Sequence, residues 1–68
     1  MIQTESQLQQ ALEQIENLCQ ALQSLRAKVF PKNPRNFAIL AEGPMDEIRK
    51  LQAAVDDYIS RLEQVGAA

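Results

Sequence analysis

The chain of 68 residues contains no histidine, no tryptophan and only one cysteine. One cysteine cannot form an internal disulfide, and without histidine the chain has too few soft ligands for a structural zinc site. A domain of this length buries only about 60% of the surface that its unfolded chain exposes. Small folds usually need disulfides, a metal or a partner subunit. Because the first two are excluded, oligomerisation remains as the source of additional stability.

Long apolar runs are also missing. No segment approaches the roughly 18 consecutive apolar residues that span a membrane. The first residues lack the basic region and the apolar core of a signal peptide. The single thiol suits a reducing compartment. We therefore expect a cytoplasmic protein with no membrane contact.

The groups that carry catalysis are scarce as well. The sequence has no histidine base, no glycine-rich phosphate loop and no constellation of metal ligands. We expect no enzymatic activity, no cofactor, no metal and no small-molecule substrate. The net charge of −2 disfavours general nucleic-acid binding, and a hydrophobic content of 46% is too high for a disordered tail.

What the chain does contain is a seven-residue apolar repeat, which predicts a helix over about 5–29. Thr4 is the expected N-cap, because Gln7 follows at capping-box spacing. Leu12 and Cys19 widen the apolar stripe, and a wide stripe indicates packing against more than one neighbouring helix. The repeat itself comprises Leu8, Ala11, Ile15, Leu18, Leu22, Leu25 and Val29.

Prolines and glycines divide the rest of the chain. Pro31 is expected to end the first helix. Asn33 and Pro34 are typical of a cap and a first helical position, which predicts a short helix over about 34–42 that ends at Gly43. A third helix over about 44–65 then begins at Pro44. Its apolar repeat is widened by Met45 and Ile59 and comprises Ile48, Leu51, Val55, Tyr58, Leu62 and Val65.

Two long helices of similar length predict an all-α fold, an antiparallel two-helix hairpin with a short helical turn between the arms. The whole chain, residues 1–68, would form this single domain. A lone hairpin would expose a continuous apolar strip, and strips of this kind mark interaction surfaces. Two hairpins packed face to face would bury the strip in a four-helix bundle, so we expect a homodimer.

The expected oligomer interface follows from the two repeats and their widened edges. Cys19 is expected to act there as a small apolar filler and not as a redox group. The predicted interface residues are Leu8, Leu12, Ile15, Leu18, Cys19, Leu22, Leu51, Val55, Ile59 and Leu62.

The connection between the helices is basic. Residues 26–35 hold four of the seven basic residues and no acidic one, with aromatic residues interleaved. Such a segment can contact a partner or the phosphates and bases of a nucleic acid, although a solvated turn is the simpler interpretation. The candidate contact residues are Arg26, Lys32, Arg35 and Phe37.

The stretch LAEGPMDEIRKLQAAVDDY, from Leu40 to Tyr58, resembles the tail segment of short bacterial helical proteins, some of which accompany toxin–antitoxin loci. The resemblance implies a small, partner-binding bacterial protein. Three functions therefore stay open. The first is a self-associating protein–protein interaction module. The second is an antitoxin-like or accessory subunit that folds on a larger protein. The third is a nucleic-acid accessory protein that uses the basic turn.

Overall fold

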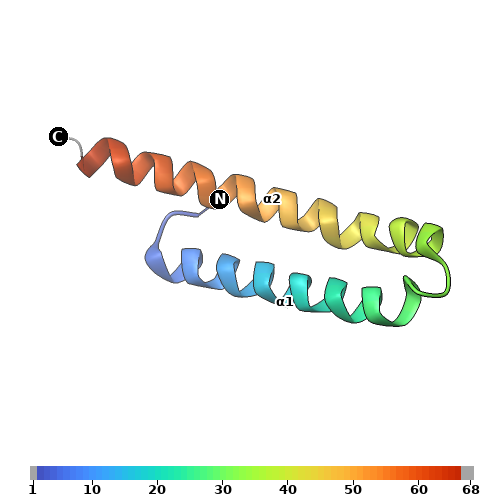
Figure 1. Ribbon diagram of the computed structural model, residues 1–68. Helices are drawn as coiled ribbons and strands as arrows, with labels where there is room; N and C mark the ends of the chain where they lie inside the picture. Colours follow the sequence, from blue (N-terminus) through green and yellow to red (C-terminus); the bar gives the residue numbers. More distant parts are fainter. Residues whose placement is uncertain (1, 67–68) are drawn as a thin grey trace.

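The computed structural model describes residues 2–66 and consists there of two helices, α1 (Glu5–Val29) and α2 (Pro34–Gly66). They lie side by side and antiparallel, so the all-α helical hairpin is confirmed (Figure 1). The molecule measures 54 × 17 × 16 Å, and its radius of gyration is 15.5 Å. A compact chain of this length would have a radius of gyration of about 11 Å. The hairpin is therefore an elongated rod whose two short dimensions are nearly equal.

Helix α1 has the predicted boundaries and the predicted cap. Thr4 is extended, with φ −131° and ψ 159°, and its hydroxyl accepts a hydrogen bond from the backbone N–H of Gln7 at 3.2 Å. The side chain of Gln7 accepts a hydrogen bond from the backbone N–H of Gln3 at 2.7 Å. The capping interaction therefore satisfies an N–H one residue earlier than in the standard capping box.

The connection between the helices, Phe30–Asn33, is short and closed by local hydrogen bonds. The backbone N–H of Asn33 donates to the carbonyl of Val29 at 2.8 Å. The Oδ1 atom of Asn33 accepts from the backbone N–H of Asn36 at 3.0 Å, which confirms the predicted cap of the second arm. The rings of Phe30 and Phe37 meet edge to face, with centroids 5.6 Å apart. These contacts fix the point at which the chain reverses.

The predicted break at Gly43 and Pro44 is wrong. Instead of a short helix over 34–42 and a separate helix from 44, the chain forms one helix, α2, with Pro44 in its interior. Pro44 has no N–H to donate to the carbonyl of Leu40, and its ring crowds that carbonyl. An interior proline costs about 3 kcal/mol and an interior glycine about 1 kcal/mol.

The seven-residue repeat explains why the helix continues. The series of Ile48 and Val55 extends back in exact steps to Ala41, and its companion series extends back to Pro44 and Phe37. Ala41 and Ile48 are buried against α1, and Pro44 is half-buried. A break at Gly43 and Pro44 would rotate the residues before it out of register with α1. It would thereby uncover the seam, the row of side chains that packs between α1 and α2. Packing therefore overrides the local preference of Gly43 and Pro44.

The open end of the hairpin is closed by a contact that the sequence repeat does not predict. Residues 2–4 turn back toward α2 (Figure 1), and the side chain of Ile2 is only 6% exposed. The Nη2 atom of Arg61 donates to the carbonyl of Ile2 at 2.5 Å. The same guanidinium lies 5.8 Å from the centre of the Tyr58 ring, and its Nε is 3.5 Å from Asp57.

The core of the hairpin is thin. The buried hydrophobic residues are Ile2, Ala11, Ala41 and Ile48, and no large side chain among residues 2–64 is fully buried. The accessible surface is 5284 Å², against about 4,300 Å² for a compact monomer of this mass. Neither helix, over the residues described, is long and apolar enough to cross a membrane. The hairpin thus leaves much apolar surface for another contact.

Candidate interaction surface

The predicted interface residues divide into two groups. The first group is half-buried between α1 and α2 and holds the hairpin together; it comprises Leu8, Ile15, Leu18, Leu22, Leu51 and Val55. The second group is exposed and comprises Leu12, Cys19, Ile59 and Leu62. A second chain would therefore meet mainly the second group.

Three of the seven large exposed apolar side chains in the described part of the chain, Leu12, Met45 and Ile59, lie on one flank of the hairpin. Leu12 is 48% exposed and Ile59 is 43% exposed, and both line one open groove between the helices. The floor of this groove is formed by Ile15 and Val55. Cys19 follows Leu12 by seven residues on α1, and Met45 precedes Ile59 by fourteen on α2, so both continue the same flank. We call Leu12, Cys19, Met45 and Ile59 the apolar strip.

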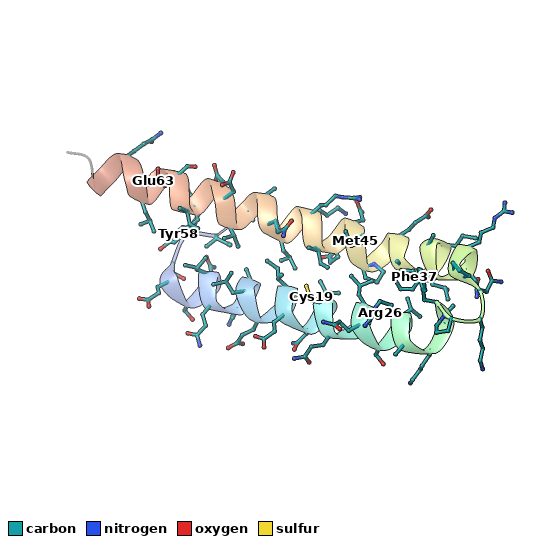
Figure 2. The ribbon with its side chains drawn as sticks, in the orientation of Figure 1. Cys19, Arg26, Phe37, Met45, Tyr58 and Glu63 are labelled. Carbon is teal, nitrogen blue, oxygen red and sulfur yellow. The ribbon has the colours of Figure 1, made fainter. Side chains whose placement is uncertain are left out.

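The labelled side chains in Figure 2 agree with this placement. Cys19 lies on the side of α1 that is turned toward α2, and its free thiol is exposed. Met45 contributes to a second groove on the same flank, lined also by Ala38, Ala41, Glu42 and Arg49. The apolar strip therefore runs along both grooves. Gln52 is the polar residue in the middle of its α2 row.

The opposite flank of the hairpin is polar. On α1 it carries Gln7, Gln14, Ala21 and Lys28, and on α2 it carries Leu40, Glu47, Ala54 and Arg61. Only Leu40, at the turn end, is a large exposed apolar residue among them. The two flanks thus differ in chemistry, although the same seam separates them. The flank that carries the apolar strip is suited to packing against another chain, and the opposite flank is suited to contact with water.

Leu62 does not belong to the strip. It occupies a seam position, yet it is 50% exposed. The reason is that α2 extends beyond the first turn of α1, so Leu62 has no helical residue opposite it (Figure 1). Three further exposed apolar side chains lie at the turn end: Phe30, Ile39 and Leu40.

The predicted contact residues of the turn come together at that end of the rod. Arg26, Lys32 and Arg35 are exposed there. Phe37 is half-buried and packs against Phe30, so its ring closes the hairpin (Figure 2). The described residues contain no group of three or more histidine, cysteine, aspartate or glutamate side chains that could hold a metal ion.

Comparison of the chain with protein-family models, with curated proteins and with solved structures finds no match. The surface chemistry of the hairpin is therefore the basis for assigning a function.

Proposed function

We propose that the protein is a non-enzymatic protein–protein interaction module whose hairpin associates with a second copy to form a four-helix bundle. The apolar strip carries this proposal. It is exposed, it is confined to one flank, and the opposite flank is polar. Exposed apolar surface of this continuity is uncommon on soluble monomers and marks a contact surface.

Association would add stability because the core of the single hairpin is thin and buries few large side chains. Fully burying an exposed leucine, isoleucine or methionine side chain contributes about 1.5–3 kcal/mol. Leu12, Met45 and Ile59 are 48%, 37% and 43% exposed in the single hairpin, so pairing would add about 1 kcal/mol for each of them. This gain is a substantial fraction of the stability of a small domain, which is about 5 kcal/mol at the low end. Part of it offsets the lost freedom of two associating chains. Pairing would supply the buried side chains that the single hairpin lacks.

Light scattering on a sizing column, with circular dichroism on the same peak, tests the proposal. The expected result is a fully helical species with twice the 7.6 kDa mass of the chain. A helical monomer at high protein concentration would contradict it. A partly unfolded monomer would contradict it too and would favour an antitoxin-like or accessory subunit that folds on a larger protein.

The basic turn supports a second candidate function, contact with a nucleic acid. Arg26, Lys32 and Arg35 are exposed at one end of the rod, and residues 17–41 include no acidic residue. Reversing two charges with Lys32→Glu and Arg35→Glu should abolish retardation of DNA or RNA at low salt while the helix content stays constant. Binding through phosphates would also weaken steeply with added salt. Equal binding by this variant and the natural chain would exclude the turn.

A further inference from the structure

We infer that the second copy docks with its turn at the opposite end of the rod, so that α1 packs against α1 of the partner and α2 against its α2. This inference rests on the proposed self-association. It is drawn from the order of residues along the apolar strip and from the distribution of charge between the two ends of the hairpin.

The α1 row of the strip has complementary ends. At seven-residue steps it reads Glu5, Leu12, Cys19 and Arg26. Turned end for end against a copy of itself, the row places Glu5 opposite Arg26 of the partner subunit, and Arg26 opposite Glu5 of the partner subunit. It also places the large Leu12 opposite the small Cys19 of the partner subunit. Opposite charges and complementary sizes therefore coincide in a single arrangement.

The α2 row follows the pattern of sizes at one of its two kinds of pair. At the same steps it reads Ala38, Met45, Gln52 and Ile59. End-for-end packing places the small Ala38 opposite Ile59 of the partner subunit and leaves Met45 opposite the similar-sized Gln52 of the partner subunit. Cores pack best when large and small side chains alternate across facing positions.

Packing with both turns at the same end would set α1 over α2 of the partner. Phe30 faces Phe37 within one hairpin, and Leu12 shares a groove with Gln52 and Ile59. A partner in the same direction would therefore bring its Ala38–Met45 segment onto Arg26 and its α2 end onto Glu5. Arg26 would then lie near Glu42 of the partner subunit, which borders the strip, whereas Glu5 would lie near Ile59 and Glu63 of the partner subunit with no basic residue of the strip flank opposite it.

The distribution of charge between the two ends of the rod also favours turns at opposite ends. All nine acidic residues lie outside residues 17–41, which hold four of the seven basic residues. Turns at the same end would gather the cations of both copies, whereas turns at opposite ends bring each basic end to an acidic one. Two kinds of contact oppose this, because Arg49 would approach Arg49 of the partner subunit and Glu42 would approach Asp56 of the partner subunit, and all three residues border the strip. Exposed long side chains of this kind lose less than about 1 kcal/mol, since water screens them.

Mixing two single variants tests the arrangement. Glu5→Arg creates repulsion against Arg26 of an identical partner, and Arg26→Glu creates repulsion against Glu5. A mixture of the two variants restores both attractive pairs in the heterodimer. Native mass spectrometry should then show heterodimers at roughly tenfold excess over the statistical ratio, from exposed pairs worth up to about 1 kcal/mol each. Glu13→Arg mixed with Lys28→Glu makes the same charge changes away from the strip and should give the statistical ratio.

A distance measurement tests the same arrangement without changing these charges. Spin labels at Asn36→Cys, in a Cys19→Ala background, mark the turn end of each copy. Opposite turns place residue 36 opposite residue 61 of the partner subunit, which predicts a label separation of about 38 Å at 1.5 Å per helical residue. Turns at the same end predict about 20 Å, two helix diameters. A natural chain that is dimeric but gives statistical mixing and the short distance would overturn the orientation alone, whereas a monomeric natural chain would overturn the proposed function as well.

Discussion

Arg61 connects the segment before α1 to α2 at the open end of the hairpin. Its guanidinium donates to the carbonyl of Ile2, lies over the Tyr58 ring and forms an ion pair with Asp57. The first of these contacts spans 59 positions of sequence. It holds Ile2 against α2, where the isoleucine side chain covers the end of the seam. A single residue of α2 thus keeps the segment before α1 in place.

Replacing this residue should therefore loosen the open end. We expect Arg61→Ala to lower the free energy of unfolding by about 1 kcal/mol, since hydrogen bonds to charged groups contribute about 1.5–3 kcal/mol and this side chain is partly exposed. Urea denaturation followed by circular dichroism measures the change. Arg35→Ala, which removes an exposed arginine from the turn end of the same helix, is the control and should have little effect. Equal effects of the two substitutions would mean that the contact with Ile2 adds no stability.

Among the elements, α2 shows most clearly what local sequence does and does not predict. The caps Thr4 and Asn33 were predictable, because each depends on residues three positions away. The continuity of α2 through Gly43 and Pro44 was not, because it depends on packing against α1. The seven-residue repeat runs without a break from Phe37 to Tyr58, which indicates one continuous helix. Glycine followed by proline locally indicates a helix end, and this local indication is the one that failed.

The same element offers a stabilising substitution. A Cβ atom added at Gly43 would have no atom within 4 Å outside the helix's own backbone. Since Gly43 lies inside a helix, we expect Gly43→Ala to raise the stability by about 1 kcal/mol. For a domain of this size that corresponds to an increase in Tm of about 4–8 °C. Thermal unfolding followed by circular dichroism measures it. A lower Tm would mean that the chain needs glycine, and therefore a break, at this position.

At the scale of the whole molecule, the sequence predicted the antiparallel hairpin and the residues that widen its apolar stripe. It did not separate the residues that hold one hairpin from those left exposed, because both kinds belong to the same repeat. Packing made the distinction: Ile15 and Val55 are covered by the opposite helix, whereas Leu12 and Ile59 are not. Nor could the repeat predict that Ile2 covers the open end of the hairpin, since Ile2 precedes the first helix.

A charge placed in the apolar strip should prevent the proposed association of two copies. If the protein forms the proposed dimer, we expect Leu12→Glu to be a monomer at micromolar concentration, because association would bury an unpaired carboxylate in each copy. Sedimentation velocity measures the change. Ala21→Glu adds the same charge to an exposed position on the polar flank and should leave the dimer intact. Dissociation by both variants would point to net charge, and dissociation by neither would place the contact elsewhere.

The four-residue connection at Phe30–Asn33 also determines how the rod assembles in time. The seam consists of layers, each made of facing residues from α1 and α2, and each layer contacts only the layers next to it. Closing the layer nearest the turn costs the least chain entropy, because the loop between its partners is shortest. Once one layer has formed, the next layer has to close only a small additional loop, so its entropic cost is small. The hairpin therefore closes from Phe30 and Phe37 outward, and the contact between Ile2 and Arg61 is the last to form and the first to open.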